Sequence, residues 1–368
     1  MNASLNEKLG TVKWGEFKYK EVFNRIEQGR RLKKDDQIDG TIPFVMSGTT
    51  NAGVVNYISN PVASFPKNAI TIDIFGNTFY RNYAFGAGDD TGVYWNDATA
   101  YSSNAMLFFA VAMQKSMMGR FSYGKKLRSS QSEDFTMHLP VTDDGTIDFD
   151  FMESFMAELE AERVAELSAY LTVSGLDNYE LSNNEMAIIE RYKKHQIPFS
   201  EFEFIKIFNN IKQGRRLKND DQLPGDIPFV MSGTTNTGVI GYISNPVARF
   251  PKNSITIDIF GNSFYRNYDF GAGDDTGVYW NTEKEYSRTC MLFFAAAMGR
   301  ALRGKYSYGK KLRSSQSIHF KMQLPTKDGK PDYDAMAALI SAVQKLVIKD
   351  VVLYADRKIE KTKDVTKR

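Results

Sequence analysis

Hydrophobic and polar positions follow two different periods along the chain. Short runs rich in Val, Ile, Thr, Phe and Tyr, divided by Gly, Asn and Pro, predict β-strands at 42–46, 53–58, 69–75 and 78–83. Only Gly76-Asn77 divides the last two runs, which indicates a hairpin with a two-residue turn. The apolar positions of 17–28 have helical spacing, and 105–118 is apolar enough for a buried helix or a strand followed by a helix.

Two longer apolar stripes, at 151–171 and 334–358, have mostly three- and four-residue spacing and contain neither Gly nor Pro. They predict long amphipathic helices, which can pack against each other as an antiparallel pair or each on its own domain. A shorter helix is predicted over 183–195, because Ser182 and Glu185 have the spacing of a capping box.

The pattern of the first half returns in the second half. The segment 42–95 matches 227–280 with seven substitutions in fifty-four positions, and the ungapped match extends over 14–140 and 199–325. The offset of 185 residues is far longer than a solenoid repeat, so one whole domain is used twice. We therefore predict an α+β fold in which two near-identical domains with curved β-sheets are separated by two long helices. The helices are expected to form an antiparallel coiled coil about a pseudo-twofold axis.

Composition narrows the class of protein. A chain of 368 residues with 42% hydrophobic residues suits two packed domains, and a net charge of +3 permits an anionic partner without requiring one. Cys290 is the single cysteine, so no disulfide can form within the chain and a reducing cytoplasm is the expected location. The start lacks a signal-peptide pattern, and no apolar run approaches the length of a membrane span.

Three motifs occur once in each half. They are SGTTN followed by GVV or GVI (47–58 and 232–243), FPKN (65–68 and 250–253) and YGKKLRSSQ (123–131 and 308–316). Together with the duplication and the separating helices, they resemble the specificity (S) subunits of type I restriction-modification systems and the similar subunits of type IIB systems. The resemblance covers nearly the whole chain. It implies two target-recognition domains at 1–149 and 197–332, with spacer helices in 150–196 and 333–368.

The same resemblance implies a function and partners. Each domain would read half of a bipartite site in the major groove of double-stranded DNA, and the helices would dock methyltransferase subunits and, in systems that cut, restriction subunits. S-adenosylmethionine would bind to the partner methyltransferase, so this chain is expected to be a non-catalytic specificity subunit with no cofactor of its own. Family members usually carry two different domains, whereas these are near-identical. Near-identical domains should prefer near-identical half-sites, and a pseudo-twofold axis would invert one half-site relative to the other. We therefore predict an interrupted palindrome as the target.

Three segments in each domain carry candidate DNA contacts. Arginine can bond guanine O6 and N7 or a phosphate, small hydroxyls and amides suit phosphates and base edges, and glutamine can pair with adenine. The first segment has Arg30, Arg31, Lys33 and Lys34, repeated as Arg215, Arg216 and Lys218. The second has Ser47, Thr49, Thr50 and Asn51, repeated as Ser232, Thr234, Thr235 and Asn236. The third has Lys125, Lys126, Arg128 and Gln131, repeated as Lys310, Lys311, Arg313 and Gln316.

Each candidate has a structural alternative. The basic segments can be solvated turns, and the Ser-Gly-Thr-Thr-Asn segment can be a turn held by its own side chains. Arg81 and Arg266, each between tyrosines and an asparagine, are further candidate contacts, although some of the neighbouring aromatics must belong to the core.

Catalytic and metal motifs are sparse. Asp89 and Asp90 are too few for a calcium loop, so a turn is expected there and no metal site is predicted. We find no nucleophile elbow, P-loop or methyltransferase Asn/Asp-Pro-Pro-aromatic motif. These absences favour a DNA binder over two alternatives, which are a self-contained DNA methyltransferase or nuclease and a duplicated module that binds something other than DNA.

Overall fold

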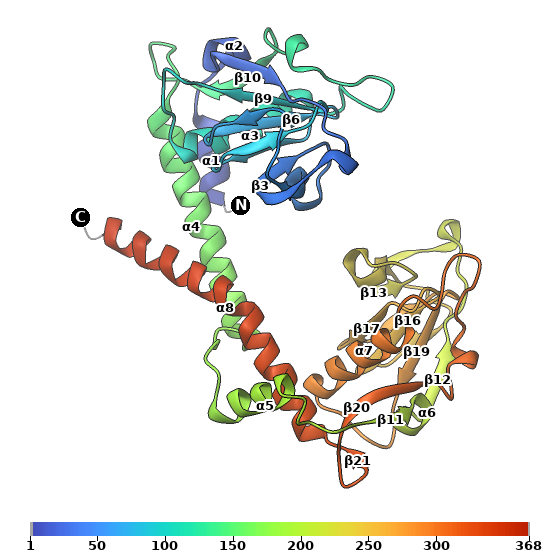
Figure 1. Ribbon diagram of the computed structural model, residues 1–368. Coiled ribbons are helices and arrows are strands. Elements are labelled where there is room, and N and C mark those ends of the chain that lie inside the picture. The colour runs from blue at the N-terminus through green and yellow to red at the C-terminus, as the bar shows by residue number, and fades with distance from the viewer. Residues whose placement is uncertain (1–2, 367–368) are drawn as a thin grey trace. The chain divides into compact units, whose positions relative to one another are not determined.

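The structure is a computed structural model that describes residues 3–366, and it divides into two compact units (Figure 1). Unit 1 is Met1–Leu167 with Ala355–Arg368, and unit 2 is Ser168–Tyr354. Both predicted long helices are present, as α4 (Phe149–Val173) and α8 (Tyr333–Thr366). Each crosses from one unit into the other, so the compact units differ from the predicted domain boundaries, which stay a prediction.

The two units repeat one succession of elements, as the duplicated sequence predicts. The remaining elements of unit 1 are α1 (Ala3–Thr11), β1 (Trp14–Lys18), α2 (Tyr19–Val22), β2 (Arg25–Gln28), η1 (Lys34–Asp36), β3 (Asp39–Val45), η2 (Thr50–Gly53), β4 (Val54–Ile58), β5 (Ser64–Phe65), β6 (Ala69–Asp73), β7 (Thr78–Arg81), β8 (Phe85–Ala87), β9 (Thr91–Trp95), α3 (Ser103–Met117), η3 (Ser129–Gln131) and β10 (Thr136–Pro140). Those of unit 2 are α5 (Asn183–Lys193), β11 (Phe199–Glu203), α6 (Phe204–Ile207), β12 (Asn210–Gln213), η4 (Asn219–Asp221), β13 (Pro224–Val230), η5 (Thr235–Gly238), β14 (Val239–Ile243), β15 (Arg249–Phe250), β16 (Ser254–Asp258), β17 (Ser263–Arg266), β18 (Phe270–Ala272), β19 (Thr276–Trp280), α7 (Arg288–Leu302), η6 (Ser314–Gln316), β20 (Lys321–Lys327) and β21 (Lys330–Pro331).

Three sheets build each unit. In unit 1 the orders are β2-β9-β6-β7, β4-β3-β8-β5 and β1-β10, and unit 2 repeats the two four-stranded orders with its own strands. All five residues of β6 are buried, so both faces of this strand are covered. Its sequence accordingly lacks exposed polar positions, and its last residue, Asp73, is a buried carboxylate. β3 is parallel to β8 and antiparallel to β4.

The main core of unit 1 lies between α3 and the sheets. α3 packs on β6, β7 and β10 and begins at Ser102, whose hydroxyl accepts a hydrogen bond from the Ala105 N–H at 3.1 Å. Ile70 and Ile72 of β6 meet Phe109 of α3 in this core. A second, smaller core around Val45, Phe65, Phe85 and Val93 lies under the sheet that contains β3. The mixed helix and strand architecture with two repeated domains is thus confirmed.

Two local predictions were wrong. The segment 17–28 is not one helix, because it contains part of β1, the single turn α2 and the strand β2. β1 pairs with β10 and β2 pairs with β9, so partners far along the chain override the helical spacing. The hairpin of β6 and β7 does form, but its turn is longer than Gly76-Asn77, since the Gly76 N–H donates to the Asp73 carbonyl and Ile72 pairs with Thr78.

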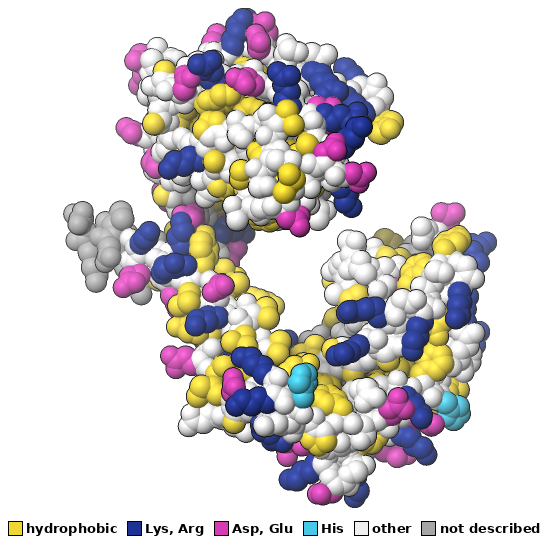
Figure 2. All heavy atoms as spheres, in the orientation of Figure 1, with side chains coloured by type: hydrophobic (Ala, Val, Ile, Leu, Met, Phe, Trp, Pro, Cys, Tyr) yellow, Lys and Arg dark blue, Asp and Glu magenta, His cyan; other side chains and the backbone are white. Residues whose placement is uncertain are grey.

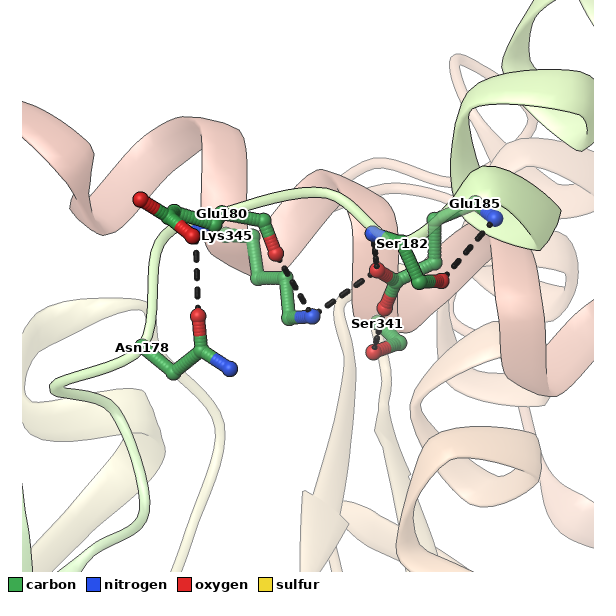
Figure 3. A network of polar contacts seen from close by, with 6 residues as sticks. All are labelled: Asn178, Glu180, Ser182, Glu185, Ser341 and Lys345. Atoms are coloured by element: carbon green, nitrogen blue, oxygen red, sulfur yellow. Dashed lines mark hydrogen bonds and ion pairs between the residues drawn. The ribbon is translucent and has the colours of Figure 1, made fainter.

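The predicted capping box of α5 is present and is part of a buried polar network in unit 2 (Figure 3). Glu185 is 6% exposed and accepts hydrogen bonds from Lys345 Nζ at 2.8 Å, Ser341 Oγ at 2.5 Å and the Ser182 N–H at 2.7 Å. Burial alone would raise the pKa of Glu185, but these partners outweigh burial and lower the pKa to about 2. The network attaches α5 to α8, where Ile188 and Leu339 also pack together.

In unit 1 the corresponding helix is α1, whose Lys8 forms an ion pair with Glu158 of α4. The last part of α8 also lies in unit 1, where Lys358 Nζ is 2.6 Å from Glu160 Oε1 of α4. Among the residues that the structure describes, every helix is too short or too polar to cross a lipid bilayer.

Candidate nucleic-acid interface

The three segments of unit 1 that carry candidate contacts are attached to one glycine-rich loop, residues 86–92, which we call the glycine loop. Its backbone forms hydrogen bonds with two other parts of the unit. The Arg30 N–H donates to the Ala87 carbonyl at 2.9 Å, and the Gly88 N–H donates to the Val45 carbonyl at 2.9 Å. The Asp90 carboxylate accepts the Ser47 N–H at 3.0 Å. Segments that are far apart in sequence therefore emerge close to one another.

The basic loop, residues 30–34, follows β2 directly. Gly29 passes so close to the glycine loop that a Cβ there would lie 2.2 Å from the Gly88 carbonyl oxygen and 2.6 Å from that of Ala87. Glycine is therefore required at this position. The side chains that follow it, Arg30, Arg31, Lys33 and Lys34, are all exposed, although Asp35 and Asp36 of η1 partly offset their charge.

The SGTTN loop, residues 47–51, is held by Asp73, which is 4% exposed. One oxygen of this carboxylate accepts the Gly48 N–H at 3.0 Å, the Ser47 hydroxyl at 3.2 Å and the Asn77 side-chain amide at 2.8 Å. The other accepts the N–H groups of Phe75 at 2.8 Å and Asn77 at 2.9 Å. The carboxylate thus joins the SGTTN loop to the β6–β7 turn, and five donors satisfy its buried charge.

The far end of the SGTTN loop has an unusual backbone. Asn51 and Ala52 both have positive φ, 48° and 50°, and their counterparts Asn236 and Thr237 do the same. This left-handed region disfavours residues with a Cβ, and it is most unusual for a β-branched threonine. Thr49, Thr50 and Asn51 are exposed and Ser47 is half-buried, so part of the segment is available to a ligand.

Arg81 and Arg266 are not available for DNA contact, which corrects the prediction. Both are 1% exposed. Arg81 donates to Thr71 Oγ1 at 3.0 Å, to the Tyr83 hydroxyl at 3.1 Å and to the Ala52 carbonyl at 2.5 Å, and burial lowers its pKa. Its guanidinium therefore supports the left-handed turn at the end of the SGTTN loop from beneath. The sequence did not reveal that the arginine side chains are covered.

The third segment, residues 122–131, is here called the lysine-rich loop, and it is tied to the glycine loop by two side chains. Arg128 and Gln28 both donate to the Asp89 carbonyl, and the other amide atom of Gln28 accepts the Ser129 N–H at 2.8 Å. Lys125, Lys126, Arg128 and Gln131 are exposed. The Gln131 side-chain oxygen accepts the Arg128 N–H at 3.0 Å, so a two-bond contact with adenine requires this local bond to open.

Unit 2 repeats the arrangement. Ser232 and Gly233 are held by Asp258 and Asp275, and Arg313 and Gln213 both donate to the Asp274 carbonyl. Apart from the buried Arg266, the basic candidates of the second copy are exposed, namely Arg215, Arg216, Lys218, Lys310, Lys311 and Arg313. Thr234, Thr235, Asn236 and Gln316 are also exposed, whereas Ser232 is half-buried. Each unit therefore presents cations and small polar groups around one loop. Figure 2 shows a group of Lys and Arg side chains along one edge of unit 1, with others scattered over the rest of the visible face.

The Asp90 carboxylate of the glycine loop has a structural use. Asp90 accepts the Ser47 N–H and the Thr91 hydroxyl, so its oxygens are occupied by the protein itself. Among the side chains that the structure describes, no cluster of three or more from His, Cys, Asp or Glu could hold a metal ion.

Sequence reasoning missed the residues that position the interface and one residue on it. Asp73 and Gln28 gave no local signal for this role, because the interface segments that they hold, at Gly48 and Ser129, lie 25 and 101 residues away. Tyr123 was used only as a motif letter, yet its ring is 82% exposed beside the lysines. Its place between a serine and a glycine in a cationic run was the available signal.

Comparisons with known proteins agree with this geometry. A family model described as the type I restriction modification DNA specificity domain matches residues 11–169 and 200–351. A specificity subunit of a type II restriction enzyme, S.BcgI from Heyndrickxia coagulans, is 30% identical over 155 residues, which are 41% of this chain and 45% of that protein. The crystal structure of a type I restriction-modification S subunit from M. genitalium has a similar fold, with a TM-score of 0.54 and 14% identity over 96% of this chain and 94% of that one.

Proposed function

Because the chain belongs to the type I restriction modification DNA specificity family, we propose that it is the sequence-reading subunit of a restriction-modification complex. Each unit would bind one half of a duplex DNA site. The observation that carries the proposal is the arrangement within each unit, where exposed cations and small polar groups from three segments surround one glycine-rich loop. The same arrangement occurs in both units.

The chemistry of these segments suits duplex DNA. Exposed Arg and Lys side chains neutralise phosphates and release counterions, which gives affinity, while arginine and small polar groups can read base edges in the major groove. Since the candidate segments are nearly identical in the two units, we propose nearly identical half-sites. If the units are related by a pseudo-twofold axis, the site is an interrupted palindrome.

The remaining parts of the proposal concern the helices and the partners. We propose that α4 and α8 form an antiparallel coiled coil that separates the units and docks methyltransferase subunits, with restriction subunits added in a system that cuts. The methyltransferase would bind S-adenosylmethionine and carry out the chemistry in the cytoplasm, so this chain supplies recognition and no catalytic group.

The test uses the full chain and a library of random-sequence DNA duplexes. We expect selection to return a bipartite motif with inverted half-sites, and we expect binding to weaken steeply with salt because phosphate contacts release counterions. An asymmetric motif would remove the palindrome. Binding that is indifferent to salt would favour a module for another ligand, and turnover by the chain alone with Mg²⁺ and S-adenosylmethionine would favour a self-contained enzyme.

A further inference from the structure

The lysine-rich loop of each unit carries a tyrosine that the fold does not bury. Tyr123 is 82% exposed, and Tyr308 is exposed to the same extent in unit 2. A tyrosine ring is largely apolar, so it normally packs in a core or in an interface with a partner. The same exposure in both units shows that the position is a property of the repeated fold.

The ring lies at the tip of a tight turn. Ser122 and Lys125 exchange backbone hydrogen bonds of 3.1 and 3.0 Å, which leaves only Tyr123 and Gly124 between them. A Cβ added at Gly124 would meet no atom within 4 Å, so the tip stands clear of the rest of the unit. The loop that follows α3 projects from the body of unit 1 in Figure 1.

The base of the turn is firmly packed. Leu127 is 3% exposed, and its N–H donates to the Ile74 carbonyl at 2.9 Å. On the other side, Phe121 stacks on Phe135 with ring centroids 6.2 Å apart. A packed base under an exposed tip presents the tyrosine ring with little freedom to fold back, which lowers the entropy lost when a ligand fixes it.

A lysine amine lies beside the ring at each tip. Lys126 Nζ lies 4.6 Å from the centre of the Tyr123 ring, and Lys311 lies at the same distance from Tyr308. Residues 122–132 and 307–317 are identical, whereas the residues just outside differ, as Phe121 and Tyr306 do. An exposed ring beside an amine matches a nucleic acid, which offers a flat base next to a phosphate.

We propose that Tyr123 and Tyr308 each stack on a nucleobase of the bound duplex, at a step that the protein locally unstacks in each half-site. The adjacent lysines contact the flanking phosphates. This inference rests on the proposed DNA-reading function and adds a second kind of reading. Pyrimidine–purine steps unstack most easily, so the tyrosines favour such a step without bonding to its base edges.

The experiment compares the full-length wild type with Tyr123→Leu, Tyr308→Leu, the double Leu variant and the corresponding Phe variants, on a duplex that the wild type selects from the random library. Stacking on one base is worth about 1–3 kcal/mol, so each Leu substitution is expected to weaken binding by about 5- to 150-fold. The salt slope should not change, because no phosphate contact is lost. The Phe variants should bind like wild type, since they keep the ring.

A second readout is 2-aminopurine placed at successive positions of the duplex. Wild type and the Phe variants should raise its fluorescence at one position in each half-site, and the Leu variants should not. The matched control is Tyr170→Leu, because Tyr170 is 63% exposed on α4 and outside the lysine-rich loop. It should bind like wild type.

Three results would overturn the proposal. Equal losses of affinity for the Phe and Leu variants would assign the contact to the tyrosine hydroxyl. Wild-type affinity of the Leu variants would place the rings outside the interface. The same 2-aminopurine fluorescence at every position of the duplex would mean that no base is unstacked. Failure of the wild type itself to bind any duplex would instead contradict the proposed function.

Discussion

Asp73→Asn is expected to release the SGTTN loop of unit 1 while leaving the fold intact. The side chain keeps its size but loses its charge, and one of its two oxygens becomes an NH2 group. The buried carboxylate of the wild type accepts five hydrogen bonds, and those from Gly48 and Ser47 hold the loop. An amide can accept at only one of its two ends.

The magnitude follows from which donors are left without an acceptor. The amide oxygen can keep the N–H groups of Phe75 and Asn77, so that the NH2 group faces the Ser47 hydroxyl, the Asn77 side chain and the Gly48 N–H. The hydroxyl and the side-chain amide can rotate to accept, but a backbone N–H cannot. Losing a charge-assisted bond and leaving that donor against another donor costs about 2–3 kcal/mol.

Hydrogen exchange of peptides covering the loop measures this local opening. The loops of the two units are identical in sequence, but Ala52 and Thr237 differ, so peptides that extend to these positions separate the units. We expect protection of the unit 1 peptide to fall by about 30- to 150-fold, with the unit 2 peptide as an internal control, and the reverse for Asp258→Asn. Wild-type exchange in the mutated unit would refute the reasoning.

Three further predictions concern stability and binding. The stability of the wild type relative to Glu185→Gln should be constant above about pH 4.5 and fall as the pH approaches 2, because the pKa of Glu185 is about 2 in the folded protein rather than 4.5. Urea unfolding of both proteins as a function of pH checks this. A stability difference that does not change with pH would contradict it. If the Arg31 guanidinium reads a base, Arg31→Ala should relax sequence discrimination by about 1–3 kcal/mol. If it contacts a phosphate, the substitution should weaken binding to all sequences and make the salt slope shallower. Unaltered binding to selected and random duplexes would exclude both contacts. Gly29→Ala should destabilise unit 1 by more than about 2 kcal/mol in the same urea assay, because the added Cβ would lie 2.2 Å from a carbonyl oxygen. The control, Gly124→Ala, has open space around the added Cβ and should change stability by less than about 0.5 kcal/mol.

The sequence predicted those features of the fold that depend on local pattern or on repetition. The helices α4, α5 and α8 have long periodic stripes or a capping box, and the duplication is visible without any structure. The segment 17–28 was mistaken for a helix because the strands that pair with β1 and β2 lie much later in the chain. Spacing within a short window does not contain that information.

The candidate interface was predictable to the extent that charge and exposure coincide. The basic residues of the first and third segments are exposed, as their composition indicates. Arg81 has the same composition signal but is covered, because its guanidinium lies under the turn that follows the SGTTN loop and donates to the Ala52 carbonyl. The groups that hold the segments together, such as Asp73 and Gln28, act across long separations in sequence and could not be found from it.

The shared attachment to the glycine loop makes the three segments of a unit mechanically dependent on one another. Displacing the loop moves the basic loop, the SGTTN loop and the lysine-rich loop at the same time. The losses of DNA-binding free energy caused by two substitutions that loosen this attachment within one unit should therefore be non-additive, because the first substitution already frees the segments that the second would free. Substitutions in different units, each of which has its own glycine loop, should combine as independent losses.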